Sequence, residues 1–156
     1  YKARRSLIKR IDPAMLTDFA FEAPFFSPAG DLRFRGNIVN YIDRLIYFTG
    51  AHEKYMLCLL RDYVGRLKAQ GGTAPLVFMD VGANAGNHAL FMSQLADRVL
   101  AFEPFERVRR QMQDNLALNH IQNVEVFDFA LSDKEERLPF YASGESNLGA
   151  SSFAKE

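Results

Sequence analysis

Two acidic residues and two glycines are spaced in a way that could hold a nucleoside. Gly82 and Gly86 share one short segment, and because neither has a Cβ atom, the backbone there can approach a ligand closely and present amides from the start of a helix. Glu103 lies 21 residues beyond Gly82, and a carboxylate there can accept hydrogen bonds from both hydroxyls of a ribose. A tight strand-to-helix turn also needs glycine, so it is Glu103 that favours a ligand site.

Asp80 bears on which nucleoside cofactor fits. The dinucleotide fingerprint needs glycine where this chain has Asn84 and Asn87. Asp80 would also lie close to a pyrophosphate, and like charges about 4 Å apart cost about 1 kcal/mol in water and about 4 kcal/mol at the intermediate dielectric of a protein surface. S-adenosylmethionine has no phosphate and carries a cationic sulfonium and an ammonium group, so Asp80 attracts it. The residues therefore favour S-adenosylmethionine as cofactor over NAD or a flavin.

The segments around these residues alternate between strand and helix patterns. Short apolar runs predict three strands, over residues 76–81, 98–102 and 124–130. Apolar residues at helical spacing predict the intervening helices, over residues 88–96 and 105–119. This order predicts an α/β fold with a parallel sheet and flanking helices. In such a sheet ligands bind at the carboxyl ends of the strands, which places the turns at 80–86, 103–105 and 128–130 at one site.

The residues before the first of these strands show a different pattern. Residues 1–72 are predicted to form an N-terminal helical and loop extension, and residues 73–156 the nucleotide-binding half of the α/β domain. Within the extension, Asp12 and Pro13 predict a short helix over 14–19, residues 21–36 read as loop with a short strand at 32–35, and residues 51–68 carry a helical pattern. The stripe of Tyr55, Leu59, Tyr63 and Leu67, with Met56, Leu60 and Val64 beside it, predicts a helix buried on one face.

Composition excludes several classes of function. The 156 residues are enough for one domain core, and 19 basic against 19 acidic side chains give a formal charge of zero, which disfavours nucleic acid as a partner. Five of the basic residues fall in positions 1–10, where a solvated helix face is favoured over a membrane or phosphate contact. The single cysteine, Cys58, excludes a disulfide framework, and no apolar run reaches the roughly 20 residues that span a bilayer. We expect a cytoplasmic protein without a membrane span.

The turn 77–86 (VFMDVGANAG) followed by 101–104 (AFEP) resembles the FkbM family of methyltransferases. The similarity continues through 115–119 (NLALN), 124–126 (VEV) and 130–133 (ALSD), and covers roughly residues 50–152. The resemblance implies a Rossmann-like methyltransferase fold and methyl transfer from S-adenosylmethionine, usually to a hydroxyl oxygen. The family's later strands have no counterpart here, so we expect the chain to be truncated after the first half of that domain.

The resemblance also implies roles for individual residues. The cofactor turn would contain Asp80, Gly82, Asn84 and Gly86, Glu103 would hold the ribose, Phe105 could pack on the adenine, and residues 128–130 would lie beside it. The complete predicted cofactor-binding set is Asp80, Gly82, Ala83, Asn84, Gly86, Asn87, Glu103, Pro104, Phe105, Asp128, Phe129 and Ala130. No metal site is predicted.

The catalytic base and the acceptor are less well defined. His88 could take the proton from an attacking hydroxyl, although a lone histidine on a helix is more often structural. The leading hypothesis is O-methylation of a small molecule or a sugar. The alternatives are an RNA methyltransferase, for which only residues 1–10 offer a basic face, and a non-catalytic module that binds the cofactor or a partner. The sequence leaves a homo-oligomer open.

Overall fold

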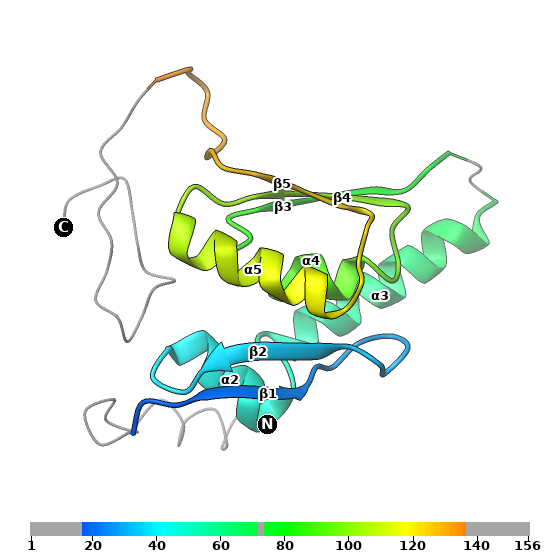
Figure 1. Cartoon of the computed structure of the whole chain (residues 1–156). Helices are drawn as coiled ribbons and strands as arrows, with labels where there is room; N and C mark the ends of the chain where they lie inside the picture. The colour runs from blue at the N-terminus through cyan, green and yellow to red at the C-terminus, as the bar shows by residue number, and fades with distance from the viewer. Residues whose placement is uncertain (1–16, 72–73, 137–156) are drawn as a thin grey trace.

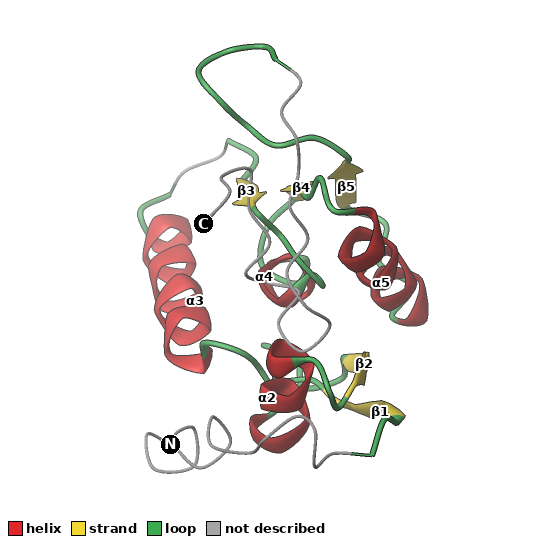
Figure 2. Ribbon diagram, turned by 90° about the vertical axis from the view of Figure 1, so that its left-hand side faces the viewer, coloured by secondary structure: helices red, strands yellow, loops and turns green. Residues whose placement is uncertain are grey.

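The computed structural model describes residues 17–71 and 74–136, and they form three layers (Figure 1). A parallel sheet lies at the top of the view, three helices lie beneath it, and an antiparallel hairpin with one further helix lies below those. Figure 2 shows the same order from the side, with every labelled helix on one side of the parallel sheet. Within the described ranges, no helix has the length and apolarity required to cross a bilayer.

The parallel sheet contains β3 (Val77–Val81), β4 (Arg98–Phe102) and β5 (Val124–Phe127), in that spatial order. The predicted strands and their parallel arrangement are confirmed. The third strand is shorter than predicted, because it ends at Phe127 and residues 128–130 follow as a loop. Those three residues therefore lie at the carboxyl edge of the sheet.

The helices of the middle layer are α3 (Lys54–Ala69), α4 (Asn87–Met92) and α5 (Glu106–Leu118). All three were predicted, although α4 ends at Met92 and not at residue 96. Buried apolar residues of α4, together with Met112 and Leu116 of α5, join those of the sheet and of the hairpin in one hydrophobic cluster. The core of the described chain is therefore continuous from the parallel sheet to the hairpin.

The predicted buried face of α3 is correct only in part, because Val64 is buried and Leu60 packs against the core. Tyr55, Leu59 and Tyr63 are 57%, 61% and 59% exposed, whereas Leu57 and Val64 are buried. The apolar residues of this helix occupy more than one face, and the described core contacts only the face with Leu57 and Val64. Helical spacing thus identified the helix but not the side that packs.

The N-terminal region contains more regular structure than predicted. Strands β1 (Ala20–Pro24) and β2 (Arg33–Asn37) pair antiparallel, with Ala20 opposite Asn37. The strand expected at 32–35 is confirmed, but the loop expected at 21–24 is wrong, because alternate side chains there are buried against the core. Residues 17–19 are not helical, and the rest of the helix predicted at 14–19 lies outside the described residues, as do residues 1–10.

Helix α2 (Tyr41–Thr49) follows the hairpin. Asn40 caps its first turn by accepting a hydrogen bond from the Ile42 amide at 3.0 Å. Gly50 ends it in the left-handed conformation, with φ 84°. This cap and stop define a helix that the sequence pattern did not predict.

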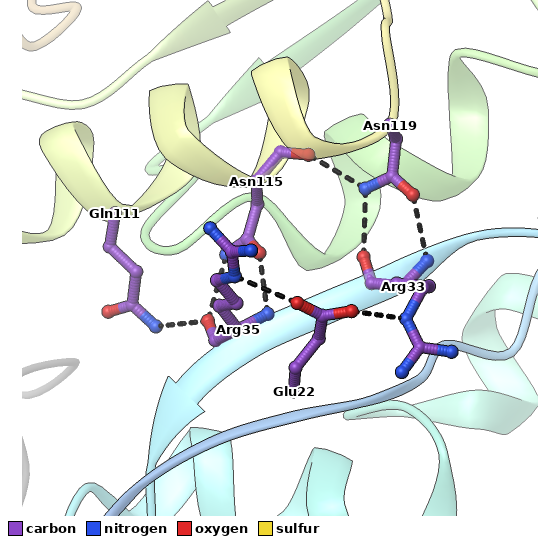
Figure 3. Close-up of polar contacts among 6 residues, drawn as sticks. All are labelled: Glu22, Arg33, Arg35, Gln111, Asn115 and Asn119. Carbon is purple, nitrogen blue, oxygen red and sulfur yellow. Dashed lines mark hydrogen bonds and ion pairs between the residues drawn. The ribbon is translucent and has the colours of Figure 1, made fainter.

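Asn115 of α5 and Asn119, which caps the end of α5, hold the hairpin against the middle layer (Figure 3). Asn115 accepts from the Arg35 amide at 2.7 Å and donates to the Arg35 carbonyl at 3.0 Å. Asn119 does the same to Arg33, at 2.8 Å for both bonds. Because residues four apart share one helix face and residues two apart share one strand edge, these side-chain amides take the place of a neighbouring strand beside β2.

Candidate functional site

The two glycines of the turn after β3 have different structural tasks. Gly82 has φ 77°, and a Cβ atom added there would meet nothing within 4 Å. Gly86 has φ 88°, and a Cβ atom there would lie 2.8 Å from the Met112 Cγ atom. Gly82 thus leaves open space above the turn, whereas Gly86 allows the start of α4 to pack against α5. Sequence reasoning gave both glycines the same ligand-approach role, and the structure separates them.

Glu103 connects the turns after β3 and β4. Glu103 is only 7% exposed. Its Oε2 atom accepts a hydrogen bond from the Asn84 amide and its Oε1 atom accepts one from the Phe105 amide, each at 2.8 Å. Asn84 adopts a left-handed conformation, with φ 51°. A carboxylate oxygen has two lone pairs, so both oxygens keep acceptor capacity for a ligand hydroxyl.

Asp80 is buried next to the start of α4. Burial raises the pKa of its carboxyl group; the imidazole of His88 and a hydrogen bond from the Ala89 amide lower it, and Glu103 raises it further. Its Oδ2 atom has no hydrogen-bond partner within the part of the chain that the structure describes. The residue is 8% exposed, so this is a buried acceptor that a donor or a cation could satisfy.

Asp80 and Glu103 lie on the same face of the sheet. Asp80 pairs with Ala101 in the parallel register, and side chains alternate between faces along a strand, so Glu103 follows Ala101 on the side of Asp80. The effect of Glu103 on the pKa of Asp80 agrees with this placement. The two carboxylates that the sequence singled out are therefore brought together at the carboxyl edge.

His88 lies beside a residue that sequence reasoning missed. The Nε2 atom of His88 is 4.0 Å from the Oε2 atom of Glu53, and the two side chains are 25% and 32% exposed. Glu53 has φ 48° and immediately precedes α3. Only its place at a helix start, after Gly50, distinguished it in the sequence, and that signal did not indicate a contact with His88.

Asn87 is engaged with the backbone of His52. Its side chain accepts from the His52 amide at 2.9 Å and donates to the His52 carbonyl at 3.0 Å, and the residue is 6% exposed. This arrangement repeats that of Asn115 with Arg35. The side-chain amide of Asn87 thus holds the segment before α3. A contact of Asn87 with a cofactor, as predicted, would therefore have to use the Asn87 backbone.

The other predicted site residues differ in burial. Ala83 is buried, and its amide donates to the Phe102 carbonyl at 3.0 Å. Pro104 and Phe105 are half-buried at the start of α5. Asp128, Phe129 and Ala130 are exposed after β5, and the ring of Phe129 lies 5.6 Å from those of Phe102 and Phe127.

The chain is similar in part to known proteins. No protein-family profile matches the chain. A stretch of 82 residues is 38% identical to the AMB antimetabolite synthetase AmbE of Pseudomonas aeruginosa, covering 50% of this chain and 4% of that protein. The solved structure of a SAM-dependent methyltransferase from Agrobacterium tumefaciens matches 76% of this chain and 34% of its own, with a TM-score of 0.50 and 11% identity. The two chains share a fold.

The expected Rossmann-like α/β fold with flanking helices is thereby confirmed. A Streptococcus mutans protein assigned as a methyltransferase and solved with SAH matches 35% of this chain and 31% of its own, at a TM-score of 0.35 and 27% identity. The chain thus spans 4% of the curated relative and about a third of these solved structures.

The carboxyl edge of this sheet offers an acidic, partly buried surface beside open backbone. The unpartnered Oδ2 atom of Asp80 can accept from an ammonium group, and Glu103 can accept from hydroxyls. Two carboxylates close together repel a phosphate and attract a cation. These two carboxylates therefore suit a ligand that carries both a positive charge and hydroxyl groups.

Proposed function

We propose that this chain forms the S-adenosylmethionine-binding part of a methyltransferase. The observation that carries the proposal is the pair of buried carboxylates, Asp80 and Glu103, on one face at the carboxyl edge, with one Asp80 oxygen unpartnered among the described residues. The open space over Gly82 supports it, because the backbone of that turn remains accessible. The shared fold with the Agrobacterium methyltransferase is consistent with it.

Glu103 would hold the ribose and Asp80 the amino-acid end of the cofactor. The Glu103 carboxylate is already oriented by the Asn84 and Phe105 amides, so little ordering is needed when it accepts a hydroxyl. Asp80 accepts a hydrogen bond from the Ala89 amide, and its buried Oδ2 atom has no partner among the described residues. The loop 128–130 would lie beside the adenine, where its exposure leaves room for a ring.

The finer proposal is an FkbM-like O-methyltransferase that acts on a small molecule or a sugar. When bound, the cofactor supplies a methyl group on a sulfonium, and a hydroxyl acceptor must lose its proton as the new C–O bond forms. His88 is the proposed base, and Glu53 would stabilise the imidazolium because its carboxylate lies 4.0 Å from the Nε2 atom. We also propose that the chain divides near residue 72 into an N-terminal extension and the cofactor-binding half of the α/β domain.

Methyl transfer by the intact protein tests the activity directly. With methyl-labelled S-adenosylmethionine, we expect label in hydroxylated small molecules or glycans and none in RNA. Label in RNA would contradict a small-molecule or sugar acceptor but would leave S-adenosylmethionine as the cofactor. Binding of the cofactor without label in any acceptor panel would favour the non-catalytic module.

The role of His88 needs a separate variant. His88→Gln should reduce the rate of methyl transfer by about a hundredfold, in the range typical of a lost general base, with the affinity for S-adenosylmethionine nearly unchanged. The matched control is His120→Gln, which changes an exposed histidine at the end of α5. Equal rates for wild type and His88→Gln would remove His88 from the mechanism.

A further inference from the structure

One cavity of the structure lies away from the proposed cofactor site. It has a volume of about 630 Å³ and lies between the connection from β2 to α2 and the outer side of α5. Its lining includes Asn40 and Asp43 from α2 and its cap, and Arg107 and Arg110 from α5. None of the predicted cofactor residues lines it, so an inference about this cavity does not depend on the cofactor assignment.

Two polar side chains in this cavity are buried with an unused atom. Asn40 is 3% exposed; its Oδ1 atom caps α2, while its Nδ2 atom has no hydrogen-bond partner in the described ranges. Asp43 is 1% exposed; its Oδ2 atom accepts from the Asn37 amide and from Gln111 Nε2, each at 2.9 Å. Its Oδ1 atom has no partner there either.

These two unused atoms have complementary chemistry. Asn40 Nδ2 can only donate, and the ionised Asp43 carboxylate can only accept. Buried polar atoms are nearly always hydrogen-bonded in folded proteins, so this buried donor and acceptor, on two residues that line one cavity, are groups that a bound molecule can satisfy. A hydroxyl group both donates and accepts, so adjacent hydroxyls on a small molecule can satisfy both atoms.

The position of Asp43 is built into the packing. A Cβ atom at Gly36 would lie 2.8 Å from the Cβ and Cγ atoms of Asp43, so the strand backbone reaches the aspartate only because residue 36 is glycine. The Asn37 amide and Gln111 then hold one carboxylate oxygen. The other oxygen is thereby fixed and is not a rotating surface group.

Cations surround the cavity on the α5 and β2 sides. Arg35, Arg107 and Arg110 line it, together with one exposed acid, Asp114. Arg35 pairs with Glu22 at 2.9 Å and Arg110 pairs with Glu106, in both cases through exposed side chains. Such surface ion pairs are weak, so a ligand anion can compete for these guanidinium groups. An acidic group on the ligand would thus be attracted to this side.

We propose that this cavity binds a small polyhydroxylated compound that carries an anionic group, such as a sugar phosphate or a sugar acid. Its hydroxyls bond to Asn40 and Asp43, and its anionic group lies among the arginines from β2 and α5. Asn40, which caps α2, then also forms part of the inner wall of a ligand site.

The test measures binding to the intact protein by saturation-transfer NMR and calorimetry. The probes are pentose and hexose phosphates and hexuronates, with the neutral sugars and inorganic phosphate for comparison. We expect at least one acidic sugar to bind at least tenfold more tightly than its neutral sugar and than phosphate alone. If no acidic sugar binds, or if phosphate alone accounts for the affinity, the proposal is wrong.

Two nearly isosteric variants locate the binding. Asn40→Asp keeps the cap oxygen and removes the donor, and Asp43→Asn keeps an acceptor for Asn37 and replaces the open acceptor with a donor. Each should weaken the acidic sugar at least tenfold. The control Asp62→Asn makes the same chemical change on the exposed side of α3 and should leave binding unchanged. Unchanged binding in both cavity variants would overturn the proposal.

A third variant covers the case in which a buried substitution unfolds the protein. Arg107→Gln combined with Arg110→Gln changes two exposed side chains of α5. It should weaken the acidic sugar and leave the neutral sugar unchanged, whereas equal loss for both sugars would contradict the assigned role of the arginines. S-adenosylmethionine titrations on the same samples separate this site from the proposed cofactor site, because the cavity variants should not change that affinity.

Discussion

The Glu103 carboxylate accepts a hydrogen bond from the Asn84 amide at 2.8 Å, and this bond joins the ends of two neighbouring parallel strands. The Oε1 atom of the same side chain accepts a hydrogen bond from the Phe105 amide at the start of α5. One buried carboxylate therefore sets the position of the glycine turn relative to the next helix. A ligand that contacts Glu103 would meet a surface already ordered by the fold.

The two glycines of that turn should respond differently to alanine. Both have positive φ, which costs an alanine about 1–2 kcal/mol. Gly86→Ala also forces Cβ against Met112, and overpacking of this kind adds about 1–3 kcal/mol. Chemical denaturation should show the larger loss of unfolding free energy for Gly86→Ala. Calorimetry should show that Gly82→Ala, the milder change in stability, reduces cofactor affinity; equal stability losses would contradict the separate roles.

The asparagine clamp on β2 should contribute strongly to stability. Asn115 is fully buried and satisfies both the amide and the carbonyl of Arg35. Asn115→Ala leaves the Arg35 amide without its partner, whereas the Arg35 carbonyl keeps the hydrogen bond from Gln111 Nε2 at 3.2 Å. We expect a cost of about 2 kcal/mol in the free energy of unfolding. Asn119→Ala exposes similar groups of Arg33 at a half-exposed position and should cost clearly less. Hydrogen exchange of the Arg35 amide would report the loss directly, and a native exchange rate in Asn115→Ala would contradict the clamp.

Sequence patterns predicted the parallel sheet because its signals are local. Each strand is an apolar run followed by a turn, and the glycine turn and Glu103 occur where two strands end. The hairpin was less predictable because Pro24, Pro28 and Gly30 indicate a loop, whereas β1 pairs with β2, which is docked by Asn115 and Asn119 from about 80 residues later. Such long-range contacts leave no local pattern.

The candidate site, too, could be predicted from the sequence only in part. The placement of Asp80 and Glu103 on one face follows from strand alternation and register, which the sequence could predict once the strands were known. The packing role of Gly86, the clamp of Asn87 on His52 and the contact of Glu53 with His88 depend on which helix faces meet. Those faces are fixed by tertiary packing, as the exposed stripe of α3 also shows.

Asp43 should make stability depend on pH. Burial raises its pKa from 3.8 to about 6, against hydrogen bonds from the Asn37 amide and Gln111 that lower it. Because the pKa of Asp43 is higher in the folded than in the unfolded protein, the protonated carboxyl group stabilises the fold. This contribution to the free energy of unfolding is fully present below about pH 4 and is lost as the pH rises through about 6. A shift of about 2 pKa units corresponds to roughly 3 kcal/mol.

Urea unfolding of wild type and Asp43→Asn at pH 4 to 8 would measure this effect. The free energy difference between wild type and variant should shift in favour of the variant as the pH rises, with most of the change between pH 4 and 7. The other charged groups lining the cavity, Arg35, Arg107, Arg110 and Asp114, are present in both proteins, so the difference reports the charge of Asp43 in their presence. A difference that does not vary with pH would show that Asp43 is not perturbed.

The most direct test of the proposed cofactor is calorimetric titration of the intact protein with S-adenosylmethionine and with NAD. We predict saturable binding of S-adenosylmethionine, none of NAD at the same concentrations, and at least tenfold weaker binding in Glu103→Ala, with Glu125→Gln, an exposed acid of β5, unchanged. Binding of NAD in preference to S-adenosylmethionine, or full affinity in Glu103→Ala, would contradict the assignment of Asp80 and Glu103.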